Sequence, residues 1–186
     1  FRYKLIMNKL DQNYQPTQVY MLSFVQELPI YSDDLSVGNT LNFSKYHSVS
    51  DNLILSGKLF LKSVNSIDDD VRVSRRIYIP SKNLRGFEPG KIGPKDGVEY
   101  VGGNFGSALN LNSTIPNVLN GFENIDLNFF FDAATLREVD YDSSLESSKI
   151  RSSTGIAVNW FTVIGPLSFS YAIPVSYTHL TLPTRS

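Results

Sequence analysis

The sequence predicts an all-β fold, part of an antiparallel up-and-down transmembrane β-barrel with about eight strands in this chain. Apolar and polar residues alternate with a period of two along most of the chain, whereas helical periodicity is nearly absent. The alternating stretches approach the roughly 9–11 residues that a tilted membrane-spanning strand needs. Their inner faces carry Asn, Asp, Lys and Ser, which suit the wet interior of an outer-membrane barrel.

The predicted strands are separated by residues that favour turns. The clearest strand runs from Asn124 to Asp132, where Ile, Leu and Phe at odd positions face one side and Asn, Asp and Phe at even positions face the other. In chain order, the predicted strands are residues 3–9, 18–27, 40–44, 53–62, 105–113, 124–132, 153–160 and 167–173. This succession without helices is typical of a meander that forms a larger barrel.

A soluble β-sandwich is the competing interpretation of the fold, because its strands alternate too. The length of the strands and the polar inner faces weigh against it, since a sandwich needs a dry core. No apolar run approaches the roughly 20 residues of a membrane-spanning helix. The chain starts at Phe1 in the middle of a pattern, without an initiator Met or a leader sequence, so we expect the natural start to lie upstream.

Composition argues against several functional classes. The 17 Lys and Arg residues nearly balance the 18 Asp and Glu residues, so the net charge of −1 offers no basic surface for nucleic acid. The absence of cysteine excludes disulfides and thiol nucleophiles. His47 has no second ligand at a metal-binding spacing, and no nucleophile motif occurs. We therefore expect no enzyme activity, no catalytic residue, no metal site and no cofactor.

Two stretches are predicted to be loops. Residues 80–104 are rich in Gly, Pro, Lys and Asp and exceed the roughly 12–15 residues above which an irregular loop usually has a function. Residues 139–149 carry acidic residues and serines and are expected to be an ordinary solvated loop. The long loop therefore holds the candidate functional residues.

Several motifs follow one another from about Arg72 to Pro174. They are Leu84-Arg85-Gly86-Phe87, Gly90-Lys91-Ile92-Gly93-Pro94, Tyr100-Val101-Gly102-Gly103-Asn104, Phe130-Phe131-Asp132-Ala133, Ile150 to Ile156 with Trp160, and Gly165 to Ala172. In order and at similar spacing, these motifs resemble the BamA family of outer-membrane protein assembly factors, within the surface-antigen type superfamily of transmembrane β-barrels. The first seventy residues match only in pattern.

The resemblance implies that the loop folds into the barrel and that Arg85 at its tip binds Asp132. An arginine inside a barrel needs an anionic partner with good geometry. Gly86 would let the backbone approach the wall closely, and Phe87 would wedge the tip against it. Many relatives carry Glu where this sequence has Asn112, so the anchor is expected to rest on Asp132, with Asn112 as a neutral neighbour. The loop glycines of the motifs are Gly93, Gly102 and Gly103.

The resemblance also implies a function. It indicates a barrel in the bacterial outer membrane that folds and inserts other β-barrel proteins without bond chemistry. Its implied partners are unfolded outer-membrane proteins as clients, accessory lipoproteins and membrane lipid, and no nucleic acid. A related barrel for two-partner-type secretion shares the Arg-Gly-Phe loop and stays the alternative, and a passive porin is disfavoured because it would leave that loop unexplained.

The last twelve residues require separate treatment. Residues 175–186, VSYTHLTLPTRS, resemble the translation of a transposase-type sequencing adapter and break the pattern just after Pro174. Alternation within this tail would also fit a native strand. We expect an artefact, and therefore assign the partial barrel to residues 1–174.

Overall fold

A computed structural model describes most of the chain. It covers residues 1–9, 18–29, 35–67, 70–118, 124–145 and 149–175. Of the suspected adapter tail, residues 175–186, only Val175 is among the described residues, as the last residue of the final strand, and residues 176–186 lie outside them. Among the described residues, no helix is long and apolar enough to cross a membrane.

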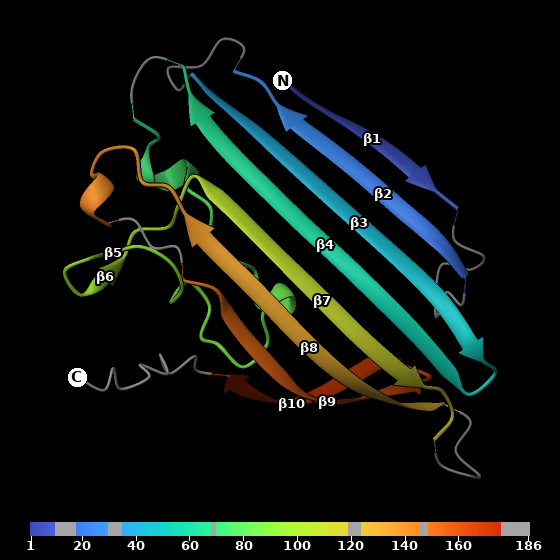
Figure 1. Cartoon of the computed structure of the whole chain (residues 1–186). Helices are drawn as coiled ribbons and strands as arrows, with labels where there is room; N and C mark the ends of the chain where they lie inside the picture. Colours follow the sequence, from blue (N-terminus) through green and yellow to red (C-terminus); the bar gives the residue numbers. More distant parts are fainter. Residues whose placement is uncertain (10–17, 30–34, 68–69, 119–123, 146–148, 176–186) are drawn as a thin grey trace, which may run out of the picture.

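Eight long antiparallel strands form one curved sheet in which each strand pairs with its neighbours in chain order (Figure 1). They are β1 (Arg2–Asn8), β2 (Gln18–Glu27), β3 (Ser36–Ser50), β4 (Leu53–Ser66), β7 (Phe105–Ile115), β8 (Ile125–Arg137), β9 (Arg151–Thr162) and β10 (Gly165–Val175). The first and last strands do not pair with each other, so the sheet curls without closing. The predicted all-β, up-and-down fold with eight strands is confirmed.

The predicted strand boundaries were too short in places. The third strand was predicted at residues 40–44 and spans 36–50, because backbone pairing with β4 continues on both sides of the apolar residues. The pairing shifts by one residue between Ser48 and Ser50, next to the two-residue turn Asp51-Asn52. Backbone hydrogen bonds thus extend the strand through polar residues that carry no hydrophobic alternation.

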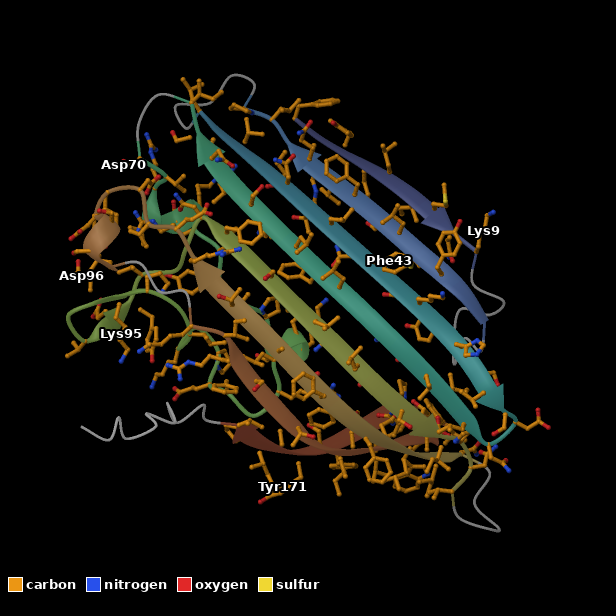
Figure 2. All side chains as sticks on the ribbon, viewed as in Figure 1. Lys9, Phe43, Asp70, Lys95, Asp96 and Tyr171 are labelled. Atoms are coloured by element: carbon orange, nitrogen blue, oxygen red, sulfur yellow. The ribbon has the colours of Figure 1, made fainter. Side chains whose placement is uncertain are left out.

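The two faces of the sheet differ as the alternation predicts. On β8, Asp126, Asn128 and Asp132 are buried on the inner face, whereas Phe129 and Phe131 on the outer face are 47% and 40% exposed. Figure 2 shows the outer side chains of β10, Tyr171 among them, projecting away from the sheet. An apolar exterior with a polar interior is the arrangement of a membrane barrel.

The segment between β4 and β7 lies inside the curve of the sheet. A short helix elsewhere in the chain, η3 (Ser143–Leu145), follows β8. The segment between β4 and β7 contains the short elements η1 (Val73–Arg75), η2 (Ser81–Asn83), β5 (Lys95–Asp96) and β6 (Glu99–Tyr100). Its tip contacts Asp132 of β8, and Gly86 lies against Ala172 of β10. The tip of the inward segment therefore lies on the concave side, against the stretch of sheet from β8 to β10.

The inner face is only partly polar, a feature that the alternation did not predict. Where the inward segment covers the sheet, apolar residues of both form a buried group that we call the dry cluster. Its members are Val64, Val71, Ile77, Ile79, Leu84, Ile92, Ala108, Ala134 and Leu136. Burial of these side chains stabilises the packing of the segment on the sheet, because apolar surface of both is removed from water.

Candidate functional site

The tip of the inward segment is held by a bidentate ion pair. The Arg85 Nε donates to Asp132 Oδ2 at 2.7 Å, and Arg85 Nη2 donates to Oδ1 at 2.7 Å. The Asp132 side chain is fully buried and the Arg85 side chain is 23% exposed. Two parallel charge-assisted hydrogen bonds fix the guanidinium in the plane of the carboxylate, which a lysine could not do.

The carboxylate of Asp132 receives two further hydrogen bonds. The backbone N–H of Arg85 donates to Oδ2 at 3.1 Å, and Asn110 Nδ2 donates to Oδ1 at 2.7 Å. Asn110 is the cross-strand partner of Asp132 and also donates to the carbonyl of Asn83 at 3.0 Å. An ionised carboxylate has about four acceptor positions, so this buried charge is fully satisfied.

Asn112 binds the same arginine. Arg85 Nη2 donates to Asn112 Oδ1 at 3.0 Å, and Asn112 Nδ2 donates to Ser56 Oγ of β4 at 3.4 Å. The amide thus supplies a neutral acceptor where a glutamate would supply a second charge. Asp132 carries the only negative charge among the side chains that bind Arg85 in the described part of the chain.

The Phe130 ring completes the support of the guanidinium. The Arg85 Cζ lies 3.5 Å from the centroid of this ring, which is the distance of a close cation–π contact. Gly155 faces Phe130 across the strand pair, and a Cβ there would come within 2.7 Å of the ring. We call Arg85, Asn110, Asn112, Phe130 and Asp132 the loop anchor.

Gly86 brings the tip against β10, which lies two strands from β8 in the same sheet. Its φ of +83° lies in the left-handed region, and a Cβ would come within 2.8 Å of the Cβ of Ala172 on β10. A side chain would therefore be strained and would collide with the wall. Phe87 is half-buried and packs against the dry cluster.

The loop glycines lie at the base of the inward segment. Gly103 forms an isolated bridge with Ile77, and a Cβ on Gly103 would meet the carbonyl of Arg137 at 2.6 Å. Gly93 and Gly102 both have positive φ, and a Cβ on either would meet Leu136 or Ile77 within 3.0 Å. Gly93 and Gly103 thus let the segment lie directly on the end of β8, and Gly102 lets the backbone of the segment approach itself near Ile77.

A second contact at the base was not predicted, because residues 139–149 were expected to be an ordinary solvated loop. Asp140 Oδ2 accepts a 2.6 Å hydrogen bond from the backbone N–H of Val71. The Arg76 guanidinium lies 3.5 Å from Asp140 and covers the Tyr141 ring at 4.4 Å. Val139 is buried as well. We call Arg76, Val71 and Asp140 the base latch.

The pKa of the Asp140 carboxyl reflects this latch. Burial by itself would raise this pKa, but hydrogen bonds from Val71, Asn104 and the backbone of Asp140, together with the charge of Arg76, hold the pKa below its usual range. The carboxylate is therefore charged at neutral pH, and the latch is formed there.

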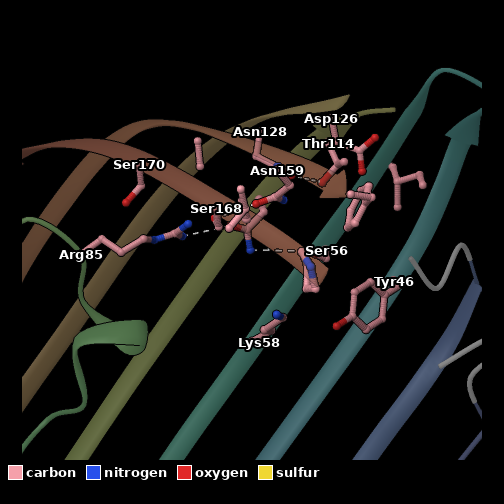
Figure 3. A pocket seen from close by; sticks show the side chains of 16 residues that line it. Tyr46, Ser56, Lys58, Arg85, Thr114, Asp126, Asn128, Asn159, Ser168 and Ser170 are labelled. Carbon is pink, nitrogen blue, oxygen red and sulfur yellow. Dashed lines mark hydrogen bonds between the residues drawn. The ribbon is translucent and has the colours of Figure 1, made fainter. Parts of the chain in front are cut away.

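The inner surface is hollowed beside Arg85. This polar pocket of about 410 Å³ is bordered by Ser56, Lys58, Asn128 and Asn159, and Figure 3 shows Arg85 reaching into it from the inward segment. Its wall combines polar side chains with apolar ones, among them Ile54, Ala157 and Phe161. The arrangement suits support of the wall and contact with polar chain segments.

The structure brings together Arg85, Gly86, Asp132 and Asn112 at one place, as the resemblance implies. Sequence reasoning did not identify Asn110, Gly155 and the stacking role of Phe130. A signal was present for two of them, since Asn110 lies two residues from Asn112 and Phe130 lies two residues from Asp132, on the same strand faces.

The ion pair should behave as one unit. Replacing either Arg85 or Asp132 by Ala leaves the other group without its partner, so each change should weaken protection of the tip by about 3–5 kcal/mol. The double variant should cost little more than either single one. Hydrogen exchange of the Leu84 and Arg85 amides measures the effect, and Lys95→Ala on the exposed hairpin is the control. Strictly additive effects would contradict the pair.

Gly86→Ala should release the tip from β10. The matched control is Gly97→Ala, because Gly97 also has positive φ but a Cβ there meets nothing within 4 Å. Both variants carry backbone strain of about 1–2 kcal/mol, and only Gly86→Ala adds the collision. Adding Ala172→Gly should restore part of the protection, as measured by hydrogen exchange. Equal effects of the two alanines would rule out the close approach.

The base latch should open in acid. Because the folded-state pKa of Asp140 is lowered, its stabilising contribution is complete above the unfolded value of about 3.9 and is lost as the pH falls below it. Exchange protection of the Val71 amide, corrected for the intrinsic rate, should fall in that window, and in Asp140→Asn, whose amide can accept a hydrogen bond but does not titrate, it should be lower at neutral pH and independent of pH there. Asp142→Asn, an exposed neighbour bonded to Ser144, should behave as the unchanged protein. A pH profile of Val71 unaltered by Asp140→Asn would refute the latch.

Comparison with known proteins agrees with this architecture. A model of the Omp85 superfamily domain matches residues 1–179. The crystal structure of BamA from Haemophilus ducreyi lacking POTRA domains 1–3 is similar with a TM-score of 0.84 and 26% sequence identity, over 96% of this chain and 39% of that BamA chain. The recognition of a BamA-like barrel and the fold of a partial barrel are thereby confirmed. The chain belongs to the Omp85 superfamily.

Proposed function

We propose that the complete protein carrying this chain folds and inserts other β-barrel proteins into the bacterial outer membrane. The observation that carries the proposal is the likeness to BamA over 96% of the chain, with the inward segment pinned by the loop anchor. Because the chain spans 39% of that BamA, the activity is proposed for the complete protein. Its clients would be unfolded outer-membrane proteins, and accessory lipoproteins would be its partners.

The role of the loop anchor in this activity is mechanical. Arg85 ties the segment to β8, Gly86 sets it against β10, and Asn112 links it towards β4. These contacts hold several strands of the inner wall in one arrangement while a client pairs with exposed strand edges of the barrel. Such an activity breaks no covalent bond, and it needs no catalytic residue or cofactor.

The outer surface supports the proposed location. Large apolar side chains on the outer faces of β7, β8 and β10 are exposed, which is unfavourable in water and favourable in lipid. Membership of the Omp85 superfamily supports the same placement. Membrane lipid is therefore part of the proposed environment of the barrel.

Reconstitution tests the proposed function. The complete protein in liposomes should speed the folding of a urea-unfolded β-barrel client, measured by the heat-modifiable mobility of the folded client on gels. Arg85→Ala should reduce the rate several-fold because the inner wall loses its support, whereas Lys95→Ala should leave it unchanged. Failure to fold clients, combined with the loss of one exported protein on gene deletion, would instead indicate the secretion barrel.

A further inference from the structure

The outer face of the sheet contains a groove centred on Gly57. Gly57 pairs with Lys45 of β3 on one side and with Leu111 of β7 on the other, so a residue without a side chain lies between two long ones. The hollow continues over β8 and has a volume of about 790 Å³. This volume is within the range of roughly 300–1,000 Å³ that is usual for small-molecule sites.

The walls of the Gly57 groove are apolar. They are formed by Leu55 and Leu59 beside the glycine, by Leu111, and by Phe129 and Phe131. Leu55, Leu111 and both phenylalanines are exposed on the outer face. Methylene groups of an acyl chain would match this surface, because the hollow is open to the outside and lined mainly by hydrocarbon.

One edge of the groove is basic. Lys45 of β3 pairs with Gly57 of β4, and His47 pairs with Leu55, so both side chains lie on the outer face of the sheet. Both side chains are exposed, and within the described residues no hydrogen bond or ion pair engages them. A lysine on a lipid-facing surface is unfavourable at the middle of a bilayer and is tolerated near its interfaces, where an anion can accompany it.

The position of the basic edge indicates the leaflet. His47 lies towards the two-residue turn at Asp51-Asn52, whereas the other ends of β4 and β7 lead into the long inward segment. In outer-membrane barrels the short turns are periplasmic and the long loops extracellular. Lys45 and His47 therefore face the periplasmic leaflet, which consists of phospholipid.

We propose that the Gly57 groove binds one acyl chain of an anionic phospholipid of the periplasmic leaflet, with the lipid phosphate beside Lys45 and His47. The inference rests on the membrane placement argued under the proposed function. The basic side chains of Lys45 and His47 favour an anionic headgroup. The missing side chain at Gly57 lets the acyl chain lie close against the sheet.

Native mass spectrometry of the complete protein in detergent tests the site, with phosphatidylglycerol, phosphatidylethanolamine and lipid A as separate probes. Phosphatidylglycerol should be retained most strongly. Lys45→Gln combined with His47→Gln should weaken its retention at least about fivefold, the ratio expected for the loss of one basic residue near a headgroup. Lys62→Gln, which removes a lysine from the inner face of β4, is the matched control and should leave retention unchanged.

Gly57→Leu tests the notch separately. A Cβ at Gly57 meets Leu111 only at 3.7 Å, so the sheet tolerates the side chain while the groove fills. This variant should lower retention of both phospholipids, with heat-modifiable mobility showing that the barrel is folded. Equal retention of phosphatidylglycerol by the Lys45/His47 variant, undiminished retention by Gly57→Leu, or stronger retention of lipid A would overturn the site. Lipid retention is measured without client folding. A failure of the lipid site can therefore be distinguished from a failure of the proposed insertion function.

Discussion

The buried pair of Arg85 and Asp132 is the interaction on which the interior of this barrel wall depends. A carboxylate with no exposed surface is costly unless every acceptor position is used, and here the guanidinium, a backbone N–H and Asn110 use them together. The charge on β8 therefore requires the tip of the inward segment, and the tip requires β8. Removing either partner leaves a buried charge, which gives the contact its specificity as well as its strength.

The pair lies where the interior changes character. On one side is the dry cluster, to which the neighbouring Leu84 belongs, and on the other is the polar pocket bordered by Ser56 and Asn159. Hydrophobic burial holds the segment to the wall without specifying its position closely, whereas the bidentate ion pair and the cation–π contact with Phe130 specify the position of the tip. The two kinds of interaction thus complement each other along one segment.

A segment of this length loses much conformational entropy when it is ordered, so a single contact would not keep it in place. The structure distributes its attachment over the tip, the glycines that lie directly on the end of β8, and the base latch of Asp140 with Val71. The outer face follows a different rule, since its apolar side chains face lipid and only the notch at Gly57 departs from a smooth surface. Inner and outer faces of the same strands therefore serve different contacts, as period-two geometry allows.

The sequence by itself determined the strands, their order and the polarity of most faces, because alternate side chains of a strand between lipid and lumen must differ in polarity. The family motifs added the partnership of Arg85 with Asp132. Only the tertiary structure decided that β3 extends to residues 36–50, that apolar side chains dry part of the interior, and that Gly155 makes room for Phe130. The same holds for Val71 and Asp140, which are 69 residues apart. Such contacts depend on the register and curvature of the whole sheet, which local alternation does not encode.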